Sequence, residues 1–461
     1  MKPRTNRAGK WAVLIAGGLA LLLATARPSA AQSPPPPAPW KNIPVRATLG
    51  NGIPWIYQKD AISPTTVVGL FIGGGKSAVP AGLDGLAAIS TRILLEIPDE
   101  GKVQDLMAQA TRLSYVCYED YSAVIVECLT EHLDEALRVA AKIIQDPLLS
   151  GLRVGRAKDL MKAYAKMDDV DPVATGHNAI LGALFGGRGY GSALYGTEAT
   201  VAAIDRKDVS GFVKRAMIKP NVFFGLQTDL EAAAVRPLIE KAFDAIPDGT
   251  PAAVDRQDPA LPENRDLAID KDTKQTYVGR AYILPRAGLP DMAKGTLLET
   301  LLGNGPGSRL WALRADERLA YEVDAELTWT KSAGILIAFL KTDRTRGAEA
   351  AAALDRTLDG LRTGSVTEDE LKASREMVRS GILRSTEPKA QRLRTIGLYQ
   401  VLGLGPEGVA GLLAAVDAVG LEDLNAFLKE ALDPARALRI KVGPPAGEIV
   451  KEEPHVRSVR R

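Results

Sequence analysis

Residues 303–314 read Gly303-Asn304-Gly305-Pro306-Gly307-Ser308-Arg309-Leu310-Trp311-Ala312-Leu313-Arg314, and this stretch is the most informative feature of the chain. It runs on through residues 315–319 into Ala320-Tyr321-Glu322-Val323, so Arg314 and Tyr321 lie seven residues apart. The glycines predict a loop in which the backbone can approach the opposite half of the protein closely. Taken alone, Arg314 also fits an ordinary solvated helix position and Tyr321 a half-buried strand position.

The N-terminus has the features of a secretory signal. Cations precede an apolar run over residues 11–24, and the small residues Ser29-Ala30-Ala31 follow it. This pattern predicts a signal peptide over residues 1–31, cleaved between Ala31 and Gln32, and a periplasmic or secreted protein. The apolar run is shorter than the roughly 20 residues that span a bilayer, so we expect no stable membrane span after cleavage.

Charge and length limit the class of the exported chain. Loss of the five cations in residues 1–31 changes the formal net charge from +2 to −3, which makes nucleic acid an unlikely partner. The remaining 430 residues exceed what one hydrophobic core usually organises. We therefore expect at least two domains.

The two cysteines are expected to be unpaired. Residues 113–119 and 121–129 alternate like the two strands of a hairpin that turns near Asp120. In that register position 117 faces about position 123, which leaves Cys128 beyond the ~7 Å Cα separation that a disulfide tolerates.

The pattern along the chain predicts an α+β sandwich. Strand-like runs occur from Val45 onward, and amphipathic helices are predicted over residues 84–96, 131–145 and 155–167. Proline-rich residues 32–42 are expected to be an extended leader, and residues 251–263 mark a linker. The resulting boundaries are an N-terminal domain 43–248, a linker 249–270, a C-terminal domain 271–446 and a tail 447–461.

The two halves resemble each other. Asp208-Val209-x-x-Phe212 precedes Pro220 in the first half, and Asp423-Leu424-x-x-Phe427 precedes Pro434 in the second. Each copy reads as a helix followed by an extended run. An internal duplication is the economical interpretation.

The glycine-rich loop, the S-R-L-x-x-x-L-R segment and the following L-A-Y-x-V resemble the C-terminal half of pitrilysin/insulinase zinc peptidases. The resemblance covers roughly residues 43–445 and includes Gly85-Leu86-Ala87, which is similar to the start of the family's zinc helix. It implies two duplicated insulinase-type α/β sandwich halves that form a clamshell when paired. In the family an H-x-x-E-H motif on the first long helix binds zinc, because its histidines share one helix face.

The zinc motif is degenerate in this chain. Ala88 and Arg92 stand at the histidine positions and Thr91 at the glutamate position, and a fixed cation at Arg92 would repel a metal ion. The segment 159–166, where the resemblance places the third ligand, has no glutamate. His132, His177 and His455 have no second histidine or cysteine at ligand spacing, so we expect no cofactor in this chain.

The resemblance gives Arg314 and Tyr321 the role of hydrogen-bonding the substrate peptide and its developing oxyanion. It therefore implies a zinc-free, exported subunit that pairs with a zinc-bearing homologue and helps it to cleave extended, unfolded peptides. The alternative is a catalytically inert structural or peptide-binding homologue. An independent hydrolase has little support, because the chain has no G-x-S-x-G motif and no histidine at a plausible spacing from either cysteine.

Overall fold

The computed structural model describes residues 42–97, 100–251, 257–303 and 305–445. The predicted signal peptide, nearly all of the predicted leader, and the predicted tail with His455 lie outside these residues. Among the described residues, no helix combines the length and the apolar composition needed to cross a bilayer.

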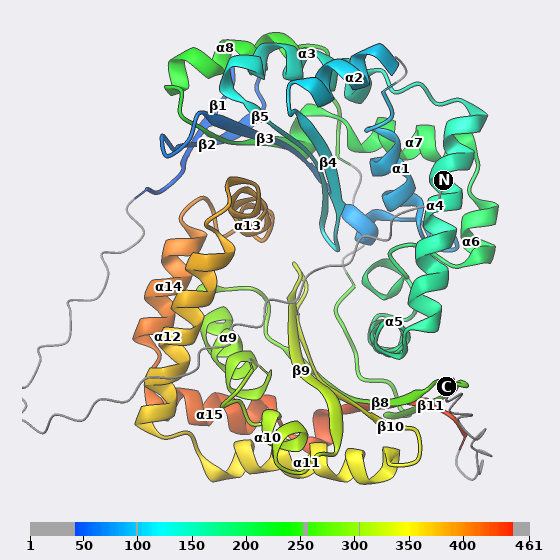
Figure 1. The fold of residues 1–461 in the computed structure, drawn as a ribbon, viewed down its shortest axis with the longest axis vertical. Coiled ribbons are helices and arrows are strands. Elements are labelled where there is room, and N and C mark those ends of the chain that lie inside the picture. Colours follow the sequence, from blue (N-terminus) through cyan, green and yellow to red (C-terminus); the bar gives the residue numbers. More distant parts are fainter. Residues whose placement is uncertain (1–41, 98–99, 252–256, 304, 446–461) are drawn as a thin grey trace, which may run out of the picture. The chain divides into compact units, whose positions relative to one another are not determined.

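The elements alternate between strands and helices, as the sequence predicts (Figure 1). The first half contains β1 (Val45–Thr48), β2 (Pro54–Lys59), β3 (Thr65–Gly73), α1 (Leu86–Ile93), α2 (Glu100–Ala108), β4 (Arg112–Cys117), β5 (Tyr121–Leu129), α3 (Leu133–Gln145), α4 (Gly151–Val170), α5 (Pro172–Leu184), α6 (Glu198–Ala203), α7 (Arg206–Ala216), β6 (Val222–Thr228) and α8 (Ala232–Ala242). The second half contains β7 (Asp266–Asp270), β8 (Gln275–Leu284), α9 (Leu289–Gly303), α10 (Trp311–Ala315), β9 (Ala320–Trp329), β10 (Gly334–Asp343), α11 (Gly347–Gly364), α12 (Glu368–Ser385), α13 (Lys389–Val401), α14 (Gly408–Ala418), α15 (Leu421–Ala431) and β11 (Leu438–Gly443).

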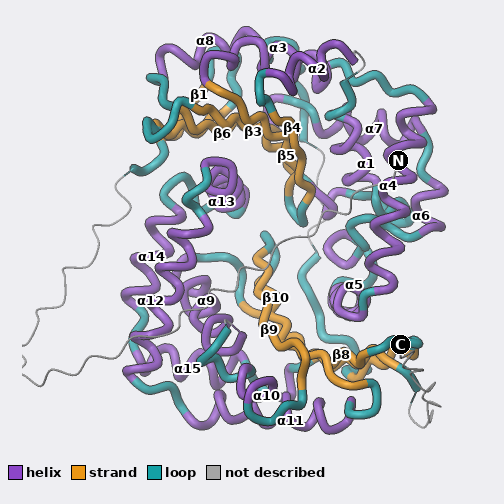
Figure 2. The backbone as a smooth tube through the Cα atoms, in the orientation of Figure 1, coloured by secondary structure: helices purple, strands orange, loops and turns teal. Residues whose placement is uncertain are grey.

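Two mixed sheets organise the described chain. The N-terminal sheet has the strand order β1-β2-β6-β3-β5-β4, and the C-terminal sheet has the order β7-β11-β8-β10-β9. The parallel pair β2/β6 corresponds to the parallel pair β7/β11, and the other neighbours in both sheets are antiparallel. The two orders match strand for strand once β1 is set aside, which confirms the predicted α+β class with duplicated halves. Figure 2 shows the strands of the two sheets with helices around them.

The repeated sequence pattern forms equivalent structures. Asp208 to Phe212 lie in α7, which leads through a 3-10 turn at Lys219–Asn221 into β6. The second copy lies in α15, which leads through a 3-10 turn at Pro434–Arg436 into β11. Strand β7 occupies residues 266–270, so the range expected to be a linker ends in a strand of the C-terminal sheet.

The predicted hairpin is present as β4 and β5, with a register that differs by one residue from the expectation. Cys117 pairs with Ser122 rather than with position 123, and Cys128 pairs with Thr66 on β3. Both cysteines are buried and free.

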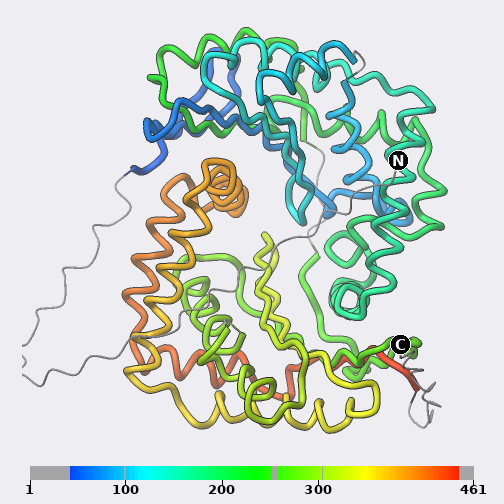
Figure 3. Tube along the Cα trace, viewed as in Figure 1, coloured from blue at the N-terminus to red at the C-terminus, as the bar shows by residue number. Residues whose placement is uncertain are grey.

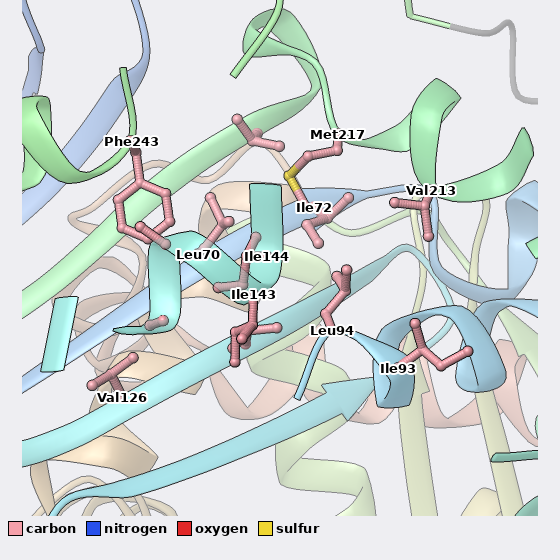
Figure 4. Close-up of a cluster of buried hydrophobic side chains, with 14 of the residues drawn as sticks. Leu70, Ile72, Ile93, Leu94, Val126, Ile143, Ile144, Val213, Met217 and Phe243 are labelled. Carbon is pink, nitrogen blue, oxygen red and sulfur yellow. The ribbon is translucent and has the colours of Figure 1, made fainter. Parts of the chain in front are cut away.

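Helices from the same half cover one face of each sheet. On the N-terminal sheet, Leu70 and Ile72 of β3 pack with Ile143 and Ile144 of α3 and with Met217, which follows α7 (Figure 4). On the C-terminal sheet, the alternate residues of β8 and β10 pack with α9 and α11. In both cores, every second side chain of a strand points to the same face of the sheet and is buried there against the helices.

The opposite face of each sheet is covered by a helix from the other half. Phe71 of β3 and Leu393 of α13 share a core on the N-terminal sheet, and Tyr277 of β8 shares one with Ile180 of α5 on the C-terminal sheet. This exchange of α5 and α13 joins residues that are far apart in the chain (Figure 3). It explains why the described residues of both sheets belong to one compact unit.

Polar contacts reinforce the exchange. The Lys389 ammonium at the start of α13 donates to the carbonyl oxygens of Asp60, Ser63 and Thr65 at 3.0, 3.0 and 2.7 Å. The Arg392 guanidinium lies 2.6 Å from the buried Asp60 carboxylate. Because these groups are largely withdrawn from water, the hydrogen bonds fix the position of α13 on the sheet.

Candidate functional site

The glycine-rich loop is held by the end of α9 and by β9. A Cβ atom on Gly303 would lie 2.2 Å from the backbone nitrogen of Ala325, so only glycine fits there. Gly305 and Gly307 have positive φ angles of 77° and 95°, which permit the sharp turn. We expected this loop to approach the opposite half, but the close contact is made by Gly303 with β9 of the same half, because the end of α9 packs directly on that strand.

The loop then leads into the short helix α10. The amide nitrogens of Arg309 and Leu310 donate to the carbonyls of Leu301 and Leu302, which folds the chain back on α9. Leu310 and Leu313 are buried in the core of the C-terminal half. Burial of these residues leaves Arg314, next to Leu313, exposed at the surface.

Arg314 has one well-defined neighbour. Its guanidinium carbon lies 5.1 Å from the centre of the Trp311 ring, a cation–π contact within α10. Among the described residues no carboxylate forms an ion pair with Arg314, so its N–H donors remain available to a ligand.

Tyr321 is the extra residue of a β-bulge. Lys341 of β10 pairs with Glu322, and the next residue, Thr342, pairs with Ala320, so Tyr321 has no opposite residue. The turn before it is fixed by the Leu319 amide, which donates to Leu313, and by the Thr342 hydroxyl, which donates to Leu319. Tyr321 is 57% exposed, and α10 packs against β9. The structure thus brings the exposed Arg314 and Tyr321 onto two adjoining elements.

The outer edge of β9 is partly occupied. The Ala325 amide donates to the carboxylate of the preceding residue, Asp324, at 2.8 Å. The Leu327 amide donates to the Glu299 carboxylate of α9 at 3.0 Å. Burial raises the pKa of Glu299 to about 7, with smaller contributions from the nearby charges of Asp324 and Glu326. These contacts use backbone donors that a peptide strand would need at this edge.

The degenerate zinc positions lie on α1. Ala88 and Thr91 are 1% and 3% exposed, and the Thr91 hydroxyl donates to the Ala87 carbonyl within the helix. The Arg92 guanidinium is partly exposed and lies 3.4 Å from the Glu96 carboxylate. The available groups are a methyl, an internally bonded hydroxyl and a cation, so these positions do not fit a zinc ion.

The histidines lie apart from these positions. His132 precedes α3 and lies 3.8 Å from the Glu131 carboxylate. His177 of α5 packs against Tyr277 and Phe339, and its burial lowers its pKa to about 4. In the described part of the chain, no group of three or more histidine, cysteine, aspartate or glutamate side chains is arranged to hold a metal ion.

Comparison with known proteins agrees with this fold. Residues 203–378, which include Arg314 and Tyr321, match the family described as the peptidase M16 inactive domain. The chain is 21% identical to YmxG of Bacillus subtilis, an uncharacterized zinc protease, over 86% of this chain and 97% of that protein.

Two solved structures have the same fold as this chain. A peptidase M16 inactive domain from Pseudomonas fluorescens superposes with a TM-score of 0.80 at 19% identity, covering 87% of this chain and 98% of that one. A protease from Helicobacter pylori also has a TM-score of 0.80, at 15% identity, covering 87% of this chain and 100% of that one. The chain fits the pitrilysin/insulinase family of peptidases. Within that family, residues 203–378 are similar to the domain described as inactive.

Proposed function

We propose that this chain is the exported, zinc-free subunit of a two-chain peptidase of the insulinase type. Its partner is a homologue with an intact H-x-x-E-H motif, and the substrates are extended, unfolded peptides. In this assembly Arg314 and Tyr321 complete the partner's active site. The export signal and the partner are inferences from the sequence and the family resemblance.

The bulge at Tyr321 is the observation that carries the proposal. A regular antiparallel register would place a partner residue opposite Tyr321, whereas the extra residue leaves its side chain exposed beside α10. Bulges are frequent next to active sites, where they change the direction of one side chain. Arg314, on the adjoining helix, has N–H donors that no carboxylate of the described chain occupies.

These two side chains suit peptide chemistry. A guanidinium donates in a planar fork to carbonyl or carboxylate oxygens, and a phenol donates one hydrogen bond. Together they could hold the carbonyl of a substrate peptide and stabilise the negative charge that develops on its oxygen. Neither is a nucleophile or a base here, so the proposal assigns them to binding and stabilisation.

The second candidate is an inert structural or peptide-binding homologue. The contact between Arg314 and Trp311 favours it, because a cation–π pair is a sufficient structural role for an exposed arginine. The exchange of α5 and α13 also gives a rigid framework that needs no catalysis.

Mixing experiments separate the two candidates. Cleavage of an unfolded, fluorogenic peptide is measured with this chain alone, with the zinc-bearing homologue alone and with both. The proposal expects cleavage only, or far more strongly, in the mixture. Cleavage by this chain alone that survives metal chelation would overturn it, and a mixture no more active than the homologue alone would support the inert candidate.

A further inference from the structure

We propose that the outward face of α4 is an interaction surface for a second copy of this chain, on which the α4 helices of the two copies pack antiparallel. This surface, called the α4 face below, consists of the exposed side chains of Leu152, Arg156, Asp159, Lys166, Met167 and Val170. It lies on the N-terminal half, whereas Arg314 and Tyr321 lie on the C-terminal half. The inference therefore does not rest on the proposed role of those two residues.

Helix α4 has one buried side and one side left to solvent. Val154, Ala157 and Met161 are buried on the inner side, and the helix is in contact with α1, α5 and α6 (Figure 1). The residues of the α4 face, together with the exposed Ala163, recur at the spacing of a helical turn. Residues at that spacing share one side of a helix, so the α4 face lies opposite the buried side.

The α4 face carries bulky apolar side chains. Leu152, Met167 and Val170 are 67%, 64% and 65% exposed. The outward side of a surface helix is normally polar, because its apolar stripe points to the core. A contact that covers these side chains gains about 25 cal/mol for each Å² of apolar surface withdrawn from water. Three such residues on one helix side therefore favour association.

The charges on the α4 face have no partners within the described ranges. Asp159 and Lys166 lie on the same flank of the face, two helical turns apart, and neither forms an ion pair with a described residue. The same holds for Arg156 on the other flank. These charges are thus free to select a partner surface and to fix its orientation.

The charge pattern is complementary to itself in one orientation. A two-fold axis that crosses a pair of helices reverses their direction and keeps each flank on its own side. Asp159 of one copy then lies opposite Lys166 of the second copy, and the symmetry repeats this pair. Parallel packing would instead set each of these two charges against its own copy. Electrostatics therefore favour the antiparallel pair.

The apolar residues agree with the same orientation. Leu152 and Val170 stand at the two ends of the helix, so antiparallel packing sets Leu152 of one copy against Val170 of the second. Arg156 then faces Met167 of the second copy, where its aliphatic stem can cover the thioether. The small side chain of Ala163, near the middle, lets the two helices approach closely.

One helix from each copy makes a small interface. Contacts of this size are smaller than those of permanent dimers, so we expect a dissociation constant of about 10–100 µM. The test is sedimentation velocity of the purified, exported chain without any other subunit, from about 5 to 500 µM. The average mass should rise with concentration toward that of a dimer. A mass that stays at the monomer value throughout would overturn the proposal.

Charge reversal tests the orientation. Asp159→Lys and Lys166→Asp should each raise the dissociation constant at least about tenfold, because symmetry creates two like-charge contacts in each variant. An equimolar mixture of the two variants should associate like the wild type. In the mixture, the lysine introduced in one variant faces the aspartate introduced in the other. Wild-type association of either single variant, or a mixture that stays monomeric, would contradict the antiparallel pair.

Matched variants control for net charge and for surface apolarity. Asp134→Lys and Lys142→Asp exchange exposed charges on α3 and should leave association unchanged, alone or mixed. Leu152→Ser should weaken association about tenfold, whereas Ile62→Ser, at a side chain 90% exposed outside the α4 face, should not. Equal effects of the paired variants would assign association to another surface. Since no turnover is measured, failure here leaves the mixing experiment on peptide cleavage unaffected.

Discussion

The guanidinium of Arg314 lies over the ring of Trp311, three residues earlier on the short helix α10. The contact holds the arginine at the surface without using a carboxylate. The N–H donors at the rim of the guanidinium therefore stay free, while its flat face is held by the indole.

Arg314→Gln should lower turnover in the mixture of the two subunits by about 10- to 100-fold, because a hydrogen bond from a charged donor is lost. The thermal stability of the chain should change little, since the side chain is exposed. Arg356→Gln, at an exposed arginine of α11, is the matched control. Equal loss of turnover in both variants would assign the effect to surface charge.

Gly303→Ala should destabilise the chain by about 1–3 kcal/mol, because the new methyl group would meet the backbone of Ala325 at 2.2 Å. Gly360→Ala is the control: Gly360 lies within α11, and no atom stands within 4 Å of its added Cβ. That substitution should stabilise by up to about 1 kcal/mol. Urea unfolding measures both changes, and an unaffected Gly303→Ala variant would contradict the packing of the loop against β9.

Lys389→Met should destabilise the chain by about 2 kcal/mol, because three carbonyl oxygens of the N-terminal half lose a charged donor. Lys372→Met, at an exposed lysine of α12, should have little effect. The measurement is again urea unfolding. Equal stability of the two variants would show that the docking of α13 does not depend on this lysine.

Glu299 should make stability depend on pH. Its folded pKa of about 7 lies above the ordinary value of 4.5, so the folded state holds a proton that the unfolded state has released. Stability should therefore fall as pH rises from about 4.5 to about 7, by up to about 1.4 kcal/mol per unit. His177, with a pKa of about 4, acts in the opposite sense, so the prediction concerns the difference between wild type and Glu299→Gln.

Glu299→Gln keeps an acceptor for the Leu327 amide and cannot ionise, so it should gain stability relative to wild type as pH rises through this range. Glu422→Gln, at an exposed residue of α15, is the control. A constant difference between Glu299→Gln and wild type from pH 4.5 to 7 would contradict the raised pKa.

Local patterns predicted much of the fold. The repeat around Asp208 and Asp423 was confirmed by the equivalent segments α7–β6 and α15–β11, because each copy carries its own helix and strand periodicity. The hairpin was also confirmed, but its register was wrong by one residue at Cys117, since a turn near Asp120 permits neighbouring registers. Local sequence patterns therefore predict where helices and strands form better than they predict which residues of two strands pair.

Non-local packing was not predictable from one sequence. The docking of α5 and α13 on the opposite sheets depends on contacts such as Lys389 with Asp60, which are separated by most of the chain. The bulge at Tyr321 depends on the register of β10.

The most direct test of the central proposal is turnover of an unfolded peptide by the mixed subunits when Tyr321 is replaced by Phe. Loss of one hydrogen-bond donor to a developing oxyanion should lower turnover by about 10²-fold, with normal assembly of the two chains. Tyr118→Phe, at another exposed tyrosine, should have no effect. Unchanged turnover by the Tyr321→Phe mixture, with assembly intact, would contradict the account.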